Sequence, residues 1–148
     1  MVSSRGESKG YLATFVEGKT RLYIAVKMDD RTKDSMFLAI SSLYNTLTSK
    51  LLKTFTVDRG KEFACYEQVE TKFGIPMYFA NAYAAWQRGT NENSNGLLRK
   101  FFPKKTNLAQ VTQDKLREAL MLINNRPRKC LGFKTPFDML KHEIRKLI

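Results

Sequence analysis

Apolar residues in the first third of the chain follow a strand-like spacing and then a helix-like one. Residues 11–16 (YLATFV) and 22–28 (LYIAVKM) are rich in β-branched and aromatic side chains, which favours two strands. The intervening EGKTR contains Gly18 and is typical of a hairpin turn. Between residues 29 and 52 the apolar positions recur at helical spacing, which predicts one long amphipathic helix.

The middle of the chain predicts a strand, a helix and a second strand. KTFTVD (53–58) and IPMYFA (75–80) are the short strands. FACYEQVETKFG (63–74) is the helix between them, and Gly74 would end it. Strands that alternate with helices indicate a mixed α/β layer architecture.

Three more helices are predicted after residue 89, each from a capping signal. Thr90 or Asn91 would cap the first of them, and Thr112 the second. Thr135 would cap the last, because Pro136 follows it at the first helical position, where proline is favoured. We therefore expect one α/β domain over residues 1–148.

Composition narrows the class of protein. The 148 residues are 43% hydrophobic, enough for one core, and contain no apolar run of the length that spans a membrane. The first residues lack the apolar region of a signal peptide. Cys65 and Cys130 form no paired spacing, so we interpret them as reduced thiols and expect a cytoplasmic protein.

The formal net charge of +12 is unevenly distributed. Residues 1–98 carry 13 basic and 10 acidic side chains, whereas residues 99–148 carry 13 basic and 4 acidic ones. A basic excess in one third of a chain is typical of a surface that faces a polyanion, most often nucleic acid. A solvated basic surface that only aids solubility is the alternative.

Two acids are candidates for chemistry. Asp58 ends a predicted strand beside Gly60, where α/β folds tend to place functional groups, although an Asp here could also cap the next helix. Glu92 opens a helix inside the basic segment 86–105, where the alternative is the ordinary preference for an acid at a helix start. Oxygen ligands without His or Cys partners suit Mg²⁺ or Mn²⁺.

Three motifs carry a family resemblance: TVDRGKEFACY, YAAWQRGTNENSNGLLRKFFPKKTN and NNRPRKCLGFKTPFDML. In this order they resemble the IS thirty family of bacterial insertion-sequence transposases, part of the DDE transposase and retroviral-integrase superfamily. The resemblance implies an RNase H-like core, in which helices flank a mixed sheet, with two appended C-terminal helices. It also implies DNA cleavage and strand transfer with Mg²⁺ or Mn²⁺, and transposon ends, target DNA and other transposase subunits as partners.

The resemblance assigns roles to particular residues. Asp58 and Glu92 match the second Asp and the Glu of the family's acidic triad, and would be catalytic metal ligands. The candidate DNA contacts are basic and amide side chains around and after Glu92: Arg88, Asn91, Asn95, Arg99, Lys100, Lys104, Lys105, Arg126, Arg128 and Lys129. For the asparagines the alternative is that they orient Glu92, and for residues 126–129 a solvated loop.

The resemblance is incomplete at the start of the chain. The family's first aspartate lies on its first strand, just before a stretch resembling VSSRG, which here begins at Val2. That acid, most of its strand and the family's N-terminal helix-turn-helix region are therefore not in this sequence. The resemblance places the strand at the centre of the sheet, so its loss would expose unpaired edges and an apolar seam.

These observations leave more than one function open. We expect the catalytic core of a DDE transposase, N-terminally truncated and inactive on its own as this chain. The alternative is a non-catalytic fragment that binds DNA or interferes with full-length subunits. A degenerate product without a selected role is a third interpretation.

Overall fold

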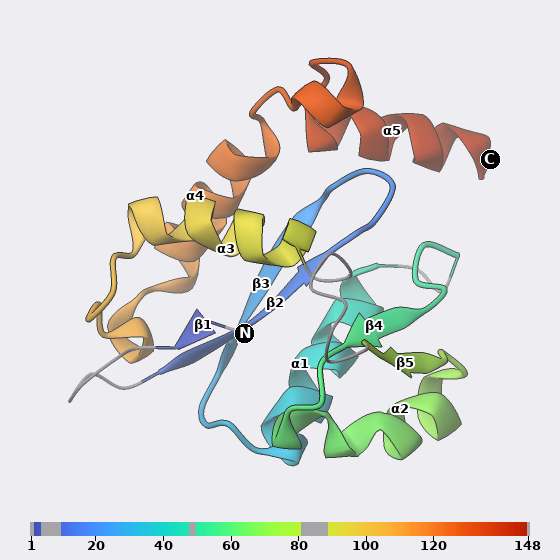
Figure 1. Cartoon of the computed structure of the whole chain (residues 1–148), viewed down its shortest axis with the longest axis vertical. Helices are drawn as coiled ribbons and strands as arrows, with labels where there is room; N and C mark the ends of the chain where they lie inside the picture. Colours follow the sequence, from blue (N-terminus) through green and yellow to red (C-terminus); the bar gives the residue numbers. More distant parts are fainter. Residues whose placement is uncertain (1, 4–9, 48–49, 81–88, 148) are drawn as a thin grey trace.

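Two small sheets lie at the centre of the protein, whose computed structural model describes residues 2–3, 10–47, 50–80 and 89–147. The first sheet is antiparallel and has the strand order β1 (Val2–Ser3), β2 (Tyr11–Val16), β3 (Tyr23–Met28). The second is a parallel pair, β4 (Phe55–Val57) and β5 (Met77–Phe79). Figure 1 shows the second pair beside β2, with helices on both sides of the β2–β3 hairpin.

The predicted hairpin is confirmed. Every residue of β2 has a partner on β3, from Tyr11 opposite Met28 to Val16 opposite Tyr23. The N–H of Glu17 donates to the carbonyl of Leu22 at 2.9 Å and closes the turn. The residue that takes the left-handed backbone conformation is not the glycine of the turn but Arg21, with φ 61°.

Helix α1 (Lys33–Thr46) is shorter than its sequence pattern predicts. Thr32 caps it by accepting a hydrogen bond from the N–H of Ser35 at 3.2 Å. The helix ends at Thr46, and Leu47 is already extended, so the prediction of one helix as far as residue 52 is wrong. Asn and Thr are weak helix formers, and they occupy the last two helical positions.

The segment between β4 and β5 begins as a 3₁₀ helix, η1 (Lys61–Cys65), and continues as α2 (Tyr66–Phe73). Gly74 ends α2 in the left-handed conformation, φ 66°, as its position predicts. The predicted strand–helix–strand order is confirmed, with each strand shorter than its apolar segment.

The remaining helices are α3 (Gly89–Phe101), η3 (Leu108–Gln110), α4 (Gln113–Asn124), η4 (Lys129–Leu131) and α5 (Pro136–Lys146). Thr112 caps α4, and Thr135 caps α5 in a capping box with Asp138, so both predictions are confirmed. The cap predicted for α3 is wrong. Thr90 and Asn91 lie inside the helix, and their side chains are bonded to the hairpin instead.

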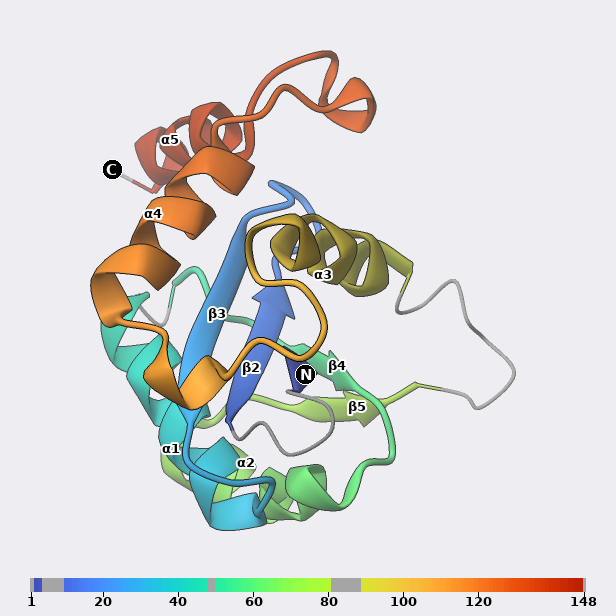
Figure 2. The same cartoon turned by 90° about the vertical axis from the view of Figure 1, so that its left-hand side faces the viewer.

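The core has one part on each face of the hairpin. On one face, Leu12 and Tyr23 pack with Leu98 of α3 and with Leu116 and Ile123 of α4. On the other face, a second cluster joins the hairpin to α1, η1, α2 and the β4–β5 pair; its fully buried members include Ala13, Met36, Ile40, Cys65 and Val69. Figure 2 shows the resulting layers, so the predicted α/β layer architecture is confirmed.

Two predictions from composition can be compared with the structure. Both cysteines are free thiols; Cys65 is buried and Cys130 exposed. Over the described residues, no helix has both the length and the apolar character needed to cross a membrane.

Candidate active site

A groove separates the two sheets, and we call it the β2–β4 groove. Its volume is about 880 Å³. Residues 14–16 of β2 line one side, residues 55–58 of and after β4 line the other, and residues 90–92 of α3 also contribute. Within the described residues, β2 and β4 belong to separate sheets with no hydrogen-bonded pairing between them.

Backbone groups of both strands face the groove. The N–H of Phe55 donates to Pro76 and the carbonyl of Val57 accepts from Ala80, so these residues face β5. Since successive strand residues alternate in direction, the N–H and C=O of Thr56 face the groove. On β2, the carbonyl of Thr14 faces it too, because it accepts a hydrogen bond from the side chain of Asn91 on α3.

Asp58 follows β4 and lines the groove. One of its carboxylate oxygens accepts from the N–H of Gly60 at 2.9 Å, which fixes the turn after the strand. A Cβ at position 60 would lie 2.6 Å from the carboxylate of Glu62, so a side chain there would require Glu62 to shift. Glu62 is buried and forms an ion pair with Arg31 at 3.2 Å, so this turn is tied to the segment before α1.

Glu92 lies in the first turns of α3, exposed at the edge of the groove. Asn91 beside it makes two bonds to Thr14: its Oδ1 accepts from the Thr14 hydroxyl at 3.1 Å, and its Nδ2 donates to the Thr14 carbonyl at 3.2 Å. The structure thus fastens the start of α3 to β2 on the residue next to Glu92.

Two more contacts fasten α3 to the other strand and the turn of the hairpin. The buried hydroxyl of Tyr23 donates to Oδ1 of Asn95 at 2.7 Å. Burial raises the pKa of Tyr23 above its ordinary value of 10.0, so the hydroxyl keeps its proton. Arg21 donates to the hydroxyl of Thr90 at 2.9 Å. The sequence did not identify Tyr23 and Arg21 as partners of α3, because the apolar pattern of the hairpin indicates only a structural role for it.

The two acids singled out in the sequence thus line one groove, although they lie on different elements. Both offer carboxylate oxygens, the donors that Mg²⁺ and Mn²⁺ prefer. Over the described part of the chain, no cluster of three or more Asp, Glu, His or Cys side chains is placed to hold a metal ion. The β2–β4 groove is therefore lined by two candidate metal-binding acids, Asp58 and Glu92.

The candidate DNA contacts fall into two groups. Asn91, Asn95 and Arg99 are engaged inside the protein, Arg99 through the carbonyls of Ser3 and Phe102. The printed partners of these asparagines are hairpin residues: Asn91 bonds to Thr14 and Asn95 to Tyr23. Arg128 is half-buried and donates to the carbonyl of Ile123, and burial lowers its pKa.

The other candidates are exposed: Lys100, Lys104, Lys105, Arg126 and Lys129. Exposed lysines and arginines can approach a phosphate backbone without first breaking the fold. Arg88 lies outside the described residues.

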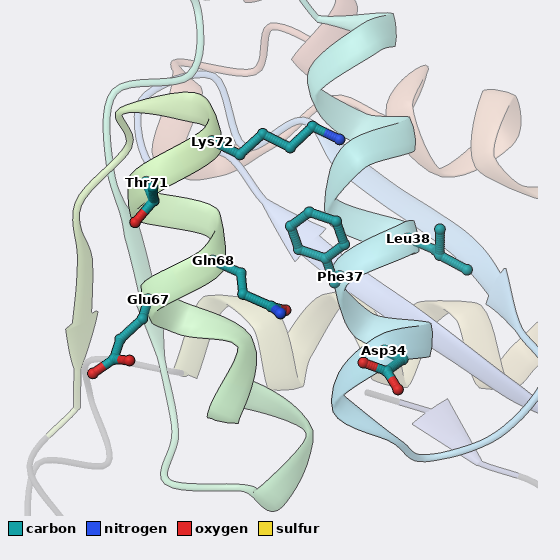
Figure 3. A pocket seen from close by; sticks show the side chains of 7 residues that line it. All are labelled: Asp34, Phe37, Leu38, Glu67, Gln68, Thr71 and Lys72. Carbon is teal, nitrogen blue, oxygen red and sulfur yellow. The ribbon is translucent and has the colours of Figure 1, made fainter.

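A second cavity, of about 670 Å³, lies between α1 and α2, away from the acid pair. Figure 3 shows the side chains that line it, which come from two neighbouring helices: Asp34, Phe37, Leu38, Glu67, Gln68, Thr71 and Lys72. The ammonium of Lys72 lies 5.3 Å from the centre of the Phe37 ring. Its acids are Asp34 and Glu67, and neither Asp58 nor Glu92 lines it.

No protein-family model matches the chain. Among solved structures, it is similar to the catalytic core domain of BIV integrase, with a TM-score of 0.73 and 22% identity over 95% of this chain and 91% of that one. The catalytic core domain of HTLV-2 integrase, solved in complex with magnesium, gives a TM-score of 0.69 with 16% identity over 92% and 88%. The chain therefore has the fold of an integrase catalytic core.

Its sequence is similar to bacterial transposases. It is 41% identical to the transposase InsI for insertion sequence element IS30A of Escherichia coli over 94% of this chain, and 36% identical to the transposase for IS1086 of Cupriavidus metallidurans over 87%. It spans little more than a third of these relatives, 36% and 38% of their lengths. Over nearly its whole length, the chain is a homologue of the IS thirty (IS30) family transposases.

Proposed function

We propose that this chain is the catalytic region of a transposase that cleaves DNA and joins the strands with the help of divalent metal ions. The observation that carries the proposal is that Asp58 and Glu92 line one groove of an integrase-type fold. The sequence relatives are transposases, and one structural relative is a magnesium complex. Several of the sequence relatives are bacterial, which supports a bacterial cytoplasmic location.

Asp58 and Glu92 are the residues that would hold Mg²⁺ or Mn²⁺. When bound between carboxylates, such ions activate an attacking oxygen and stabilise a leaving oxygen in phosphodiester transfer. The chain's own contribution is to hold the two acids in place. Gly60 fixes the carboxylate of Asp58, and the contacts of Asn91 and Asn95 hold the helix that carries Glu92.

DNA is the proposed partner, together with other transposase subunits. Exposed basic side chains at Lys100, Lys104 and Lys105, and at Arg126 and Lys129, would contact phosphates. Each phosphate neutralised contributes about 0.9 to the slope of log affinity against log salt concentration. We therefore expect steeply salt-dependent binding with little sequence preference.

We further propose that this chain does not transfer strands on its own, because the described residues supply only two of the acids that a three-carboxylate site needs. The alternative function, a fragment that binds DNA or interferes with complete transposase subunits, rests on the same basic surface without the metal chemistry.

The test is a strand-transfer assay on labelled DNA in Mg²⁺. It compares this chain with a version in which the segment preceding the matched region of the IS30A transposase is joined before Val2. We expect activity only in the extended protein. Asp58→Asn and Glu92→Gln should abolish it, while Glu67→Gln, an exposed acid on α2, should leave it unchanged. A folded extended protein that is inactive, or that stays active with Asp58→Asn, would contradict the proposal.

A further inference from the structure

Residues 126–134, which we call the α4–α5 loop, are held together by hydrogen bonds of their own backbone. The N–H of Arg128 donates to the carbonyl of Lys134 at 2.9 Å, which joins the two ends of the loop in an antiparallel bridge. The carbonyl of Arg128 accepts from the N–H of Leu131 at 3.0 Å and from that of Phe133 at 2.9 Å. Figure 2 shows the loop at the top of the view, where it extends away from the two sheets.

Phe133 lies in this loop with its ring in solvent, because the residue is 70% exposed. Its φ is 65°, in the left-handed region that bulky side chains rarely adopt. Its N–H is bonded within the loop, so the strained backbone is part of the loop's fixed conformation. A strained and exposed aromatic residue contributes little to the core, and backbone strain of this kind is found most often at sites that bind a ligand.

The charges around this ring are positive. Residues 125–135 contain four basic side chains and no acidic one. Burial and, after it, the charge of Arg126 lower the pKa of Arg128, so the two positive groups repel each other. Among the described residues, no ion pair neutralises the three exposed basic side chains of the loop, which are Arg126, Lys129 and Lys134.

The acid nearest to Phe133 in the sequence belongs to the next helix. This acid is Asp138, which accepts a hydrogen bond from the N–H of Thr135 at 3.1 Å in the cap of α5. The α4–α5 loop therefore combines one exposed aromatic ring with an excess of positive charge. This combination favours a polyanion that also has flat apolar faces.

We propose that the α4–α5 loop binds DNA at an unpaired base, on which the ring of Phe133 stacks while the exposed basic side chains of the loop contact adjoining phosphates. Aromatic rings stack on bases of any sequence, and basic side chains hold the backbone beside them. Bases within a duplex are already stacked on their neighbours. Only a single-stranded, frayed or extruded base offers a free face to the ring.

This inference rests on the proposed function and adds to it the form of DNA that a second surface binds. Residues 126–134, all of which the structure describes, are not among the residues that line the β2–β4 groove with Asp58 and Glu92. The loop would hold an unpaired part of the DNA apart from the two acids. Its contribution would be to binding and not to the chemical step.

The experiment measures binding of the whole chain to labelled DNA by fluorescence anisotropy. The first probe is a single strand of mixed sequence. The matched control is a strand of equal length built from abasic sites, which keeps the phosphates and lacks the bases. Relaxed, closed circular duplex, whose bases are paired and which has no ends, is tested as a competitor.

Phe133→Asn removes the ring at a residue type that tolerates the left-handed backbone better than Phe does. Its melting temperature should therefore be no lower than that of the unmodified chain. We expect it to bind the single strand about fivefold or more weakly, and to bind the abasic strand and the duplex within about twofold of the unmodified chain. Phe133→Tyr, which keeps a ring, should bind as the unmodified chain does. Leu38→Ala, at a similarly exposed apolar residue on α1, is the control and should change nothing.

The dependence on salt separates the ring from the charges. Lys134→Gln removes a phosphate contact, so it should lower the slope of log affinity against log salt concentration on the single strand by about 0.7. Phe133→Asn should weaken binding and leave this slope unchanged, because stacking displaces no counterions. An equal fall in slope for both variants would overturn the assignment of the ring to a base.

Several outcomes would contradict the inference. Equal losses on the single strand, the abasic strand and the duplex would show that Phe133 does not recognise an unpaired base. Unchanged binding in Phe133→Asn, with self-association lost in sedimentation, would show that the ring contacts a second copy of the chain instead.

The same measurements separate this inference from the proposed function. Salt-dependent DNA binding that is unaffected by Phe133→Asn refutes the stacking site and keeps DNA as the partner. Ring-dependent binding of the single strand, together with an extended protein that transfers no strands, refutes the catalytic proposal and keeps the stacking site. A chain that binds none of the three DNAs refutes both.

Discussion

The outer edge of β3 and the groove edge of β2 lie on opposite sides of the same hairpin. They differ in how many of their backbone groups are bonded to a side chain from a neighbouring helix. At β3, Asn124 of α4 accepts from the N–H of Tyr23 at 2.9 Å and donates to its carbonyl at 2.8 Å. Asn124 is only 3% exposed, so its amide acts as a short piece of strand under the cover of α4. At β2, Asn91 reaches only the carbonyl of Thr14, and its oxygen is bonded to the Thr14 side chain.

This difference shows which strand edge the fold covers with a helix. Free strand edges are prone to unwanted pairing, and proteins cover them with helices, loops or charged side chains. Among the described residues, Asn124 covers the β3 edge at Tyr23, whereas no strand pairing joins β2 to β4 across the β2–β4 groove. A strand edge whose backbone groups are paired under the cover of a helix contributes more to stability than one that faces a groove open to water.

The largest expected effect comes from opening the closed edge. Asn124→Leu leaves the buried N–H and C=O of Tyr23 without partners and should lower the free energy of unfolding by about 3 kcal/mol. Urea unfolding followed by circular dichroism measures the loss. The neighbouring Asn125→Ala, at an exposed side chain, serves as the control and should change stability little. A loss no larger than that of the control would show that α4 protects the edge without Asn124.

The matching change at the groove edge should cost less. Asn91→Ala removes the bonds to Thr14, but water in the groove can reach the carbonyl that is left, so we expect a loss of about 1 kcal/mol. The same urea experiment measures it. If Asn91→Ala destabilised the protein as much as Asn124→Leu, the comparison of the two edges would fail.

Tyr23 bonds to Asn124 at the edge of β3 and to Asn95 of α3, and its hydroxyl should make the free energy of unfolding depend on pH in the alkaline range. Burial raises its pKa in the folded state above the ordinary value of 10.0, so the folded protein keeps a proton that the unfolded chain releases. The contribution of Tyr23 to stability is complete below pH 10 and declines as the pH rises above that value. Between about pH 9.5 and about pH 10.5 the loss should be about 0.7 kcal/mol. Tyr23→Phe should remove this part of the pH dependence in urea titrations; an unchanged pH dependence would contradict it.

The smallest effect is expected at the tip of the hairpin. Lys19 pairs with Glu143 of α5 at 3.0 Å, and the side chain of Lys19 is 61% exposed. Because exposed ion pairs are screened by salt, Glu143→Gln should lower the melting temperature only slightly in dilute buffer and not at all at high salt. A loss that persists in high salt would indicate that Glu143 acts through packing.

Local signals in the sequence predicted much of this fold. Thr112, Thr135 and Gly74 were placed correctly, because their roles depend on neighbours within one turn of helix. The cap of α3 was misplaced because Thr90 and Asn91 satisfy groups on the hairpin, far away in the sequence. Such long-range partners leave no local pattern.

The candidate site also has a part that the sequence predicts and a part that it does not. Asp58 and Glu92 were predicted as site residues from their motifs, and both line one groove. The groove itself depends on which strands pair, and the closing of the β3 edge depends on Asn124, which in sequence is an ordinary residue near a helix end. Neither can be deduced without the arrangement of the elements in space.

Our central proposal is that Asp58 and Glu92 bind the same divalent ion, and Mn²⁺ titration followed by nuclear magnetic resonance tests it most directly. Bound Mn²⁺ broadens the signals of nearby nuclei. We predict that the amide signals of Asp58 and Glu92 broaden together over one range of Mn²⁺ concentration, and that Asp58→Asn removes the broadening at Glu92 as well. Broadening at two separate concentrations, or a Glu92 signal that responds equally in the Asp58→Asn variant, would contradict the claim.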